Sequence, residues 1–164
     1  HLDHILGLPD VPAGTPIYTG PGELDARAGT NALLRRTHNG LLDGHDALRS
    51  WDFDEAPVIG GLPAIDVLGD GSLWALSTPG HTPGSASYLA NTTEGPMLFV
   101  GDTSHTRWGW EHGVTPGTYT SDHSTNAESL ALLRALVDEV AGVQVWMGHD
   151  LEGEGTGVEA ITAR

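Results

Sequence analysis

Six histidine and aspartate residues lie in four short segments of this sequence, and together they could bind metal ions. Three of the four segments come just past an apolar strand, in a turn that contains Gly or Pro. Turns of this kind form the rim of a sheet, where loops meet and ligands bind. The six candidate ligands are His1, Asp3, His4, His81, Asp102 and His149.

The first segment, His1-Leu2-Asp3-His4, holds three potential ligands within four residues. Zinc binds imidazole nitrogen and carboxylate oxygen at about 2.0–2.2 Å. Ligands this close together in a tight turn serve two adjacent ions more easily than one. Taken alone, the segment also fits a solvated, His-rich stretch, so the prediction of a metal site depends on the other segments.

The other three segments each contribute one candidate ligand. Two Pro-Gly pairs frame His81 within Thr78–Ser85, and Asp102 directly follows a hydrophobic strand. A carboxylate can bridge two cations with its two oxygens, which suits a dinuclear site. His149 follows a strand and a glycine, and the neighbouring Asp150 could orient an imidazole. Each segment has an ordinary explanation as a polar turn, but the four in this order predict a two-metal site.

The composition narrows the chemistry and the partners. There are no cysteines, so any transition-metal site must use imidazole and carboxylate ligands. Seven arginines, with no lysine, stand against 22 acidic residues, and the net charge is −15. Such a surface repels phosphate backbones, so we expect no nucleic-acid partner. No apolar run approaches a membrane span and no signal peptide is visible, so we expect no membrane partner and a cytoplasmic location.

The elements that must position these ligands alternate between short strands and a few helices. Ser72–Ser77 alternates apolar and polar residues at period two, and Asp70-Gly71 before it predicts a hairpin turn. Met97–Val100 is apolar enough to predict burial on both faces. The stretch Asn39–Phe53 is predicted to be irregular. The remaining predicted strands are Thr15–Thr19, Pro63–Leu68, Ser85–Ala90 and Val143–Met147.

The best predicted helix spans Asn126–Val140, and a shorter one spans Asn31–Arg36. Thr125 followed by Glu128 predicts a capping box at the start of the long helix, and Gly142 lies just past its end. A hairpin-rich sheet followed by a helix and a strand predicts a mixed α/β fold. The apolar stripe of the long helix is formed by Leu130, Leu133, Val137 and Val140, widened by Leu132 and Leu136.

These segments resemble the signature of the metallo-β-lactamase superfamily, which is His-x-His-x-Asp-His, a single His after a strand, a bridging Asp and a last His. The match begins at the second His of that signature, His1, and continues through Thr-Pro-Gly-His81-Thr-Pro-Gly-Ser, Val-Gly-Asp102-Thr and Gly-His149-Asp. The resemblance spans nearly the whole chain. It implies an αββα sandwich with the metals at one edge between the two sheets.

By this resemblance, His1 and His81 bind the first metal, Asp3, His4 and His149 bind the second, and Asp102 bridges. The first His of the signature would lie two residues before His1, and the preceding strands of the family are also absent from the sequence. We therefore interpret residues 1–164 as one partial domain, with part of the first αβ half of the sandwich missing. We expect the chain alone to bind metal poorly.

The resemblance implies hydrolysis assisted by two divalent metal ions. Zinc is the favoured metal, with iron, manganese and cobalt as alternatives. The ions activate a water that attacks a carbonyl, and Asp3 orients the water or accepts its proton. The expected partner is a small-molecule substrate. The sequence is silent on oligomeric state.

Two branches of the family are candidates for the substrate. The His81 segment and the ending Gly148-His149-Asp150 resemble N-acyl-homoserine lactonases, which carry a Tyr a few residues past the bridging Asp. His105 takes that place here, and it could polarise a carbonyl or donate a proton, or be an ordinary loop histidine. Thr78–Ser85 also suits the thioester hydrolases of the glyoxalase II branch, but the C-terminal stretch is poor in the basic residues that this branch uses. We therefore favour a lactone or another small ester.

The alternative to an enzyme is a catalytically silent member of the family. The aromatic residues after Asp102 could line a substrate pocket or cover the core beneath a long loop. Trp51 and Phe53 could join them in a lid. Three further histidines match no motif and are predicted to lie on the surface. The aromatic set after Asp102 is Trp108, Trp110, His112 and Tyr119. The three histidines that match no motif are His38, His45 and His123.

Overall fold

A six-stranded mixed sheet forms the centre of the structure, a computed structural model that describes residues 1–26, 32–45 and 48–150. The strand order is β3-β4-β5-β6-β7-β8. All neighbours in this sheet pair antiparallel except β7 and β8, which run parallel. The strands are β3 (Val58–Ile59), β4 (Leu62–Asp66), β5 (Leu73–Ser77), β6 (Ala86–Thr92), β7 (Gly95–Phe99) and β8 (Gln144–Trp146).

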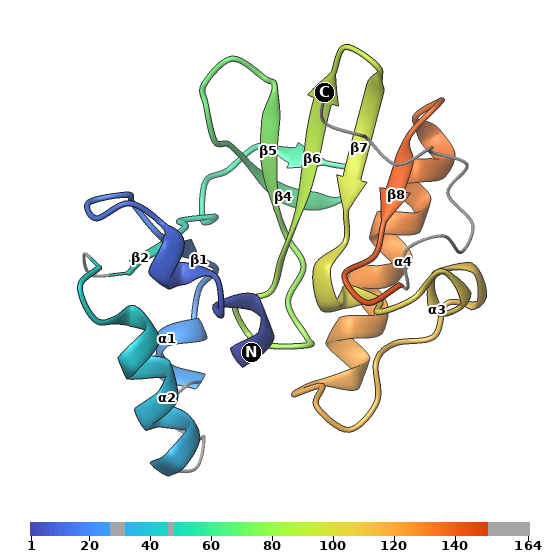
Figure 1. Cartoon of the computed structure of the whole chain (residues 1–164). Helices are drawn as coiled ribbons and strands as arrows, with labels where there is room; N and C mark the ends of the chain where they lie inside the picture. Colours follow the sequence, from blue (N-terminus) through green and yellow to red (C-terminus); the bar gives the residue numbers. More distant parts are fainter. Residues whose placement is uncertain (27–31, 46–47, 151–164) are drawn as a thin grey trace, which may run out of the picture.

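The direction of the strands places three predicted ligand segments at one edge of the sheet. Since β5 and β7 are both antiparallel to β6, they run in the same direction, and β8 runs parallel to β7. The C-terminal ends of β5, β7 and β8 therefore meet at one edge, where the N-terminus also lies (Figure 1). The segments that contain His81, Asp102 and His149 follow these three strand ends.

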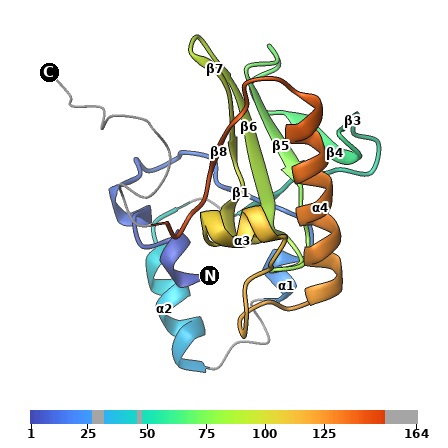
Figure 2. The ribbon, with the colours of Figure 1, turned by 90° about the vertical axis from the view of Figure 1, so that its right-hand side faces the viewer.

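The long helix α4 (His123–Glu139) packs along one face of this sheet (Figure 2). The residues buried between the two follow the period of each element, two along the strands and three or four along the helix. Removing a leucine side chain from water contributes about 1.5–3 kcal/mol, so this contact anchors the helix. The buried set is Leu62, Ala64, Leu76, Leu89, Leu98, Val100 and Val145 from the sheet segments, with Leu130, Leu133 and Leu136 from α4.

The start of α4 differs from the sequence prediction. The N-cap is Asp122, whose carboxylate accepts the Thr125 backbone N–H at 3.0 Å and the Thr125 hydroxyl at 2.9 Å. The predicted capping box at Thr125 is therefore wrong, because the stronger acceptor three residues earlier satisfies the free N–H groups of the first turn. The predicted stripe is confirmed at its centre, but Leu132 and Val140 are exposed.

Most strand predictions are confirmed with shifted ends, but several of the predictions are wrong. Leu98 is fully buried while its neighbour Phe99 is 42% exposed, so β7 alternates and is not buried on both faces. The stretch Asn39–Phe53 is not wholly irregular, because α2 (Ala32–Leu42) extends into it and β2 (Arg49–Ser50) lies within it. The hairpin at Asp70-Gly71 joins β4 to β5 as predicted.

The N-terminal part of the chain forms a smaller unit beside the sheet. Strand β1 (Tyr18–Thr19) pairs parallel with β2, and Tyr18 stacks on Trp51 at 4.1 Å between ring centroids. The short helices are η1 (Leu2–His4), η2 (Leu8–Asp10) and α1 (Glu23–Ala26). The predicted strand Thr15–Thr19 is thus only two residues long, and the helix predicted at Asn31–Arg36 is longer than expected, although Asn31 itself lies outside the described residues.

The N-terminal unit contacts the turn that follows β5 through glycine backbones. The Gly20 N–H donates to the Gly84 carbonyl at 3.2 Å, and the Gly84 N–H donates to the Glu23 carboxylate at 3.1 Å. A side chain at Gly20 would overlap the Gly84 backbone, so the close approach requires glycine there.

Within the part of the chain that the structure describes, no helix is long and apolar enough to cross a membrane.

Gly80 has no room for a side chain, and we expect Gly80→Ala to destabilise the fold. A Cβ at this position would overlap the backbone of Asn126 in α4, and the φ angle of +132° is one that alanine rarely adopts. Overpacking of this kind costs about 1–3 kcal/mol. Thermal melts should show a clear drop in Tm for Gly80→Ala. Gly117→Ala is the control, since a Cβ there meets nothing within 4 Å. Equal melting temperatures for the two variants would contradict this packing.

We expect Asp122→Ala to lower Tm at neutral pH by removing the cap of α4. Hydrogen bonds from Ser124 and Thr125 lower the pKa of Asp122 to about 2. A lowered pKa stabilises the folded state at pH values above the ordinary carboxyl pKa of about 4, and this stabilisation is lost as the pH falls towards 2. The difference in Tm between the wild type and Asp122→Ala should therefore shrink over that range.

The control for the cap is Glu128→Ala, which removes the exposed carboxylate of the capping box predicted from sequence. It should leave Tm nearly unchanged. A larger loss from Glu128→Ala than from Asp122→Ala would show that the capping box, not Asp122, begins the helix.

Candidate metal centre

Four elements deliver the six predicted ligands to one small volume. Helix η1 carries Asp3 and His4, with His1 as its N-cap residue. Asp102 lies in the short helix η4 (Gly101–Thr103), immediately past β7. His81 follows β5, and His149 follows β8. Because β5, β7 and β8 run in the same direction, His81, Asp102 and His149 all reach the edge where η1 lies.

One group consists of His1, His81 and Asp102. The Nε2 atom of His81 lies 2.9 Å from His1 Nδ1 and 3.1 Å from Asp102 Oδ2. His1 Nδ1 lies 4.0 Å from the same carboxylate oxygen. His81 is 2% exposed, so its nitrogen is held in a nearly closed environment.

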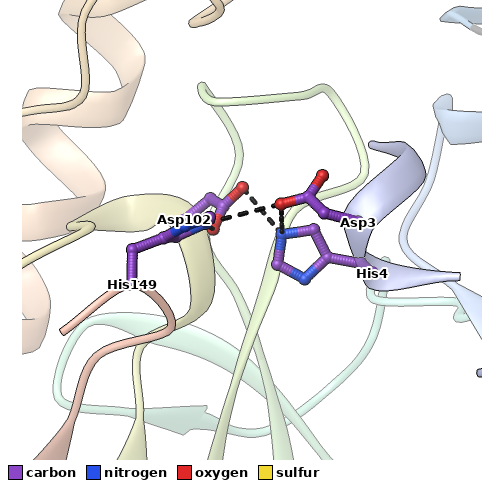
Figure 3. A group of neighbouring side chains, drawn as sticks. All are labelled: Asp3, His4, Asp102 and His149. Carbon is purple, nitrogen blue, oxygen red and sulfur yellow. Dashed lines mark hydrogen bonds and ion pairs between the residues drawn. The ribbon is translucent and has the colours of Figure 1, made fainter. Parts of the chain in front are cut away.

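A second group consists of Asp3, His4, Asp102 and His149 (Figure 3). His4 Nε2 lies 2.9 Å from Asp102 Oδ2, and His149 Nε2 lies 3.1 Å from Asp102 Oδ1. The Oδ2 atom of Asp3 lies 3.5 Å from His4 Nε2 and 3.6 Å from His149 Nε2. The structure thus brings the six residues together in the two sets that the resemblance implies, with Asp102 common to both.

The spacing of these atoms fits divalent cations. Ligands at about 2.0–2.1 Å from a tetrahedral ion lie roughly 3.3 Å apart. The donor atoms of each group lie within 4.8 Å of one another, and the donors are imidazole nitrogens and carboxylate oxygens. Lone pairs that converge in this way repel unless a cation or protons lie between them. The residues present therefore fit divalent cations that prefer imidazole and carboxylate ligands.

Asp102 is the electrostatic centre of the cluster. Burial by itself would raise the pKa of its carboxyl, but hydrogen bonds from His4 and His81 outweigh burial and hold this pKa well below the ordinary range. The hydrogen bond to Asp102 raises the pKa of His4, and this effect outweighs burial, which lowers it. The carboxylate is thus stabilised in its charged form, which is the form that binds cations.

The segment before α4 fixes the backbone and side chain of His81. The hydroxyl of Thr120 lies 3.2 Å from His81 Nδ1, and the Ser121 N–H donates to the His81 carbonyl at 2.9 Å. The Ser129 hydroxyl donates to the Pro79 carbonyl at 2.7 Å. These bonds attach the His81 turn to the first turns of α4.

The loop of Asp102 is attached to the same helix. The fully buried Asn126 donates from Nδ2 to the Thr103 carbonyl at 3.2 Å. Sequence reasoning missed both Thr120 and Asn126. No local spacing marks them, because they contact the ligand segments only through the packing of α4 on the sheet.

His105 lies beside the cluster but makes fewer contacts than the predicted ligands. Its Nε2 is 3.7 Å from Asp102 Oδ2, and its ring centroid is 4.2 Å from that of His149. Among the described residues this buried nitrogen has no hydrogen-bond partner. Burial lowers the pKa of His105, with Asp102 opposing this effect. The structure therefore places His105 beside the cluster with a buried ring nitrogen that has no hydrogen-bond partner among the described residues.

Asp150 does not have the role predicted from sequence. Its carboxylate accepts the Arg107 backbone N–H at 2.8 and 3.1 Å, and so it holds the start of helix α3 (Arg107–His112). No hydrogen bond from Asp150 to an imidazole occurs in the described part of the chain. A free N–H at the first turn of a helix is a strong competitor for a nearby carboxylate.

The aromatic residues after Asp102 divide between the core and the surface. Trp110 is buried in the core, whereas Trp108 is exposed and stacks on His112 at 4.5 Å. Tyr119 is 78% exposed and its ring lies 6.3 Å from that of His1, which places it at the border of the cluster. The stretch is partly helical, because α3 lies within what was predicted as a loop.

The remaining aromatic and histidine predictions have mixed outcomes. Trp51 packs on Tyr18, so the predicted lid of Trp51 and Phe53 stays a prediction. His123 is exposed at the start of α4, as predicted. His38 and His45 are only partly exposed, and neither belongs to the two ligand groups found among the described residues.

Comparison with known sequences places residues 1–149 within the model of the metallo-beta-lactamase superfamily. The chain is 37% identical over 101 residues to the N-acyl homoserine lactonase AttM of Azorhizobium caulinodans, covering 61% of this chain and 36% of that protein. It is 35% identical over 111 residues to the gamma-lactamase MBL2 of Gibberella moniliformis, covering 64% of this chain and 46% of the relative. The chain thus spans less than half the length of these curated relatives.

Solved structures show the same fold. A B. thuringiensis AiiA variant with N-decanoyl-L-homoserine bound at its active site has a TM-score of 0.65 at 23% identity, over 85% of this chain and 49% of that one. AidC, a dizinc quorum-quenching lactonase, has a TM-score of 0.53 at 14% identity, over 79% of this chain and 46% of that one. The predicted fold class is confirmed, and the chain belongs to the metallo-β-lactamase superfamily.

Proposed function

We propose that this chain carries the two-metal site of a hydrolase that opens a small lactone or ester. His1 and His81 would hold one metal ion, Asp3, His4 and His149 would hold the other, and Asp102 would be shared by both. The observation that carries the proposal is the Asp102 carboxylate, which has His81 and His4 at Oδ2 and His149 at Oδ1. A cluster of imidazoles around one buried carboxylate is the ligand pattern that a dinuclear site requires.

Two divalent cations held there would activate a water and polarise the substrate carbonyl. The residues of the chain supply the remaining parts of the reaction. Asp3 is an exposed carboxylate at the border of the second group, and it orients the attacking water or accepts its proton. The buried Asp102 holds its charge between the two groups and keeps them at a fixed separation. Zinc suits these ligands best, with iron, manganese or cobalt as alternatives.

His105 acts on the substrate. Burial lowers the pKa of its ring, which favours the neutral form, and its Nε2 lies 3.7 Å from Asp102 Oδ2. A neutral imidazole can donate a hydrogen bond to the carbonyl oxygen or a proton to the leaving oxygen. We assign His105 the position that a tyrosine occupies in the lactonases that this sequence resembles.

The similarity to AttM supports a lactone as the substrate, and the named products in the related structures are open acyl-homoserines. The similarity to MBL2 supports a second candidate of related chemistry, a γ-lactam. Both are small cyclic acyl compounds that water opens at the carbonyl. The acidic surface fits a small neutral substrate better than a nucleic acid.

We expect Asp102→Ala in the full-length gene product to lose metal, because the variant removes the only carboxylate shared by both groups. Elemental analysis should find about two metal ions per wild-type chain and less than one in the variant. Asp138→Asn, at an exposed position near the end of α4, is the control and should retain both. Full metal content in Asp102→Ala would refute the ligand assignment, and a wild type that binds no metal would indicate a catalytically silent member of the family.

We expect the metal-loaded full-length protein to open an N-acyl-homoserine lactone, and His105→Phe to lower kcat by about 10²–10⁴-fold. The phenyl ring keeps the volume near His149 but cannot donate a proton or a hydrogen bond. Metal content should be unchanged, since His105 is not among the proposed ligands. Initial rates of acid release measure both effects.

The matched control is His123→Phe, because His123 is exposed at the start of α4 and belongs to neither ligand group of the described residues. It should keep wild-type kcat. Turnover of a γ-lactam in place of the lactone would select the second candidate. Turnover only of a thioester or a β-lactam would overturn both, and undiminished lactone turnover by His105→Phe would remove His105 from the mechanism.

A further inference from the structure

His149 lies past the end of a short strand that pairs on one side only. Strand β8 has three residues, and in the described part of the chain β7 is its single neighbour in the sheet. His149 itself belongs to no helix or strand. Its side chain is 38% exposed, whereas that of His81 is 3% exposed. The position of His149 therefore depends on contacts outside the ladder of the sheet.

Hydrogen bonds attach the segment of His149 to the chain around the start of α3. The His149 N–H donates to the His105 carbonyl at 3.1 Å. Arg107 makes two further contacts. Its backbone N–H donates to the Asp150 carboxylate at 2.8 and 3.1 Å, and its Nη2 donates to the Val145 carbonyl at 2.6 Å. Arg107 thus binds the chain both before and after His149.

The guanidinium of Arg107 lies at the outer edge of β8. Successive carbonyls of a strand point to opposite sides within the sheet. The Trp146 carbonyl accepts the Val100 N–H at 3.0 Å, which is on the side of β7. The Val145 carbonyl, one residue earlier, therefore points to the side where the described sheet has no further strand. Arg107 supplies the donor that a neighbouring strand would otherwise supply.

We propose that Arg107 is a positioning residue, which holds His149 where its ring meets the Asp102 carboxylate. His149 Nε2 lies 3.1 Å from Asp102 Oδ1 and 3.6 Å from Asp3 Oδ2, so even a small shift of this segment changes both distances. Groups that orient a metal-binding histidine tune the affinity of its site. Loss of the Arg107 contacts should therefore weaken the metal ion of the second group and spare that of the first.

The effect on metal binding rests on the proposed function, whereas the attachment of the His149 segment is a property of the folded chain alone. The two are therefore measured separately, first in the metal-free protein and then with zinc.

Hydrogen exchange of the His149 backbone amide in the metal-free, full-length protein is the first test. Arg107→Met keeps an unbranched side chain but removes the guanidinium donors. Loss of one hydrogen bond of ordinary net strength changes a local opening equilibrium by about 2–10-fold, so we expect the amide to exchange faster by about that factor. Arg107→Lys can still donate to the Val145 carbonyl and should stay close to the wild type.

The matched control is Arg134→Met, because Arg134 also donates from Nη2 to a backbone carbonyl, that of Glu111 at 3.3 Å. Glu111 lies towards the other end of α3, so this variant should leave the His149 amide unchanged. A wild-type exchange rate in Arg107→Met, or an equal change in Arg134→Met, overturns the role of Arg107.

Zinc titration against a competing chelator is the second measurement. We expect Arg107→Met to weaken one of the two bound ions by about 10–100-fold and to leave the other near its wild-type affinity. The same substitution in a His4→Ala background, which lacks a ligand of the second group only, should have little further effect. Equal weakening of both ions in Arg107→Met would show a purely structural role and would overturn the proposal.

Asp150→Ala provides a second variant in case Arg107→Met does not fold. It removes the acceptor of the Arg107 backbone N–H and leaves the guanidinium unchanged. It should speed exchange of the His149 amide and weaken the same zinc ion. Wild-type behaviour of Asp150→Ala in both measurements would contradict the proposed attachment.

The two proposals fail in different ways. A faster His149 amide in Arg107→Met, in a protein that binds no zinc, supports the role of Arg107 in holding the segment and refutes the metal site. Two zinc ions bound by Arg107→Met with wild-type affinity support the metal site and overturn the role of Arg107.

Discussion

The charge of the Asp102 carboxylate is the constraint on which the rest of the site depends. Its side chain is 8% exposed, and a carboxylate this far from water is stable only if it is paired. The partners are imidazoles from separate segments, with His4 and His81 at one oxygen and His149 at the other. Holding this one charge therefore requires the N-terminus, the turn after β5 and the end of β8 to come together.

The sheet meets this requirement through the direction of its strands. Because β5, β7 and β8 run the same way, the residues just past their C-terminal ends share one edge. Helix α4 then fixes the loops against each other, through Ser129 on the turn before His81 and Asn126 on the loop of Asp102. The buried leucines of α4 and the sheet thus act on the site indirectly, because they fix the position of the helix that carries Ser129 and Asn126. The packing of α4 thus positions the hydrogen bonds to the loops, and the loops position the imidazoles around the charged Asp102.

The same scaffold sets the limits of the family comparison. Membership in the superfamily rests on a match to residues 1–149 and on the shared fold, whereas the substrate depends on side chains around the cluster. At the border of the cluster, His105 lies beside Asp102 and the exposed Tyr119 lies near His1. The regions compared make up 36% and 46% of the lengths of two curated relatives.

The sequence by itself determined the identity of the six clustered residues, the position of β5 and the centre of the apolar stripe of α4, because each is set by short-range spacing. The predicted half-buried alternation of β5 is wrong, since Ala75 and Leu76 are both fully buried. It also identified the hairpin before β5, since turn chemistry is local. Only the tertiary structure decided the N-cap of α4, the exposure of Phe99 and the partner of Asp150. At the N-cap a second local acceptor, Asp122, competes with the predicted capping box. One face of the sheet decides the exposure of Phe99, and the distant Arg107 N–H is the partner of Asp150. Thr120 resembles Asp150 in this respect, because its contact with His81 exists only once a segment nearly 40 residues away has folded against it.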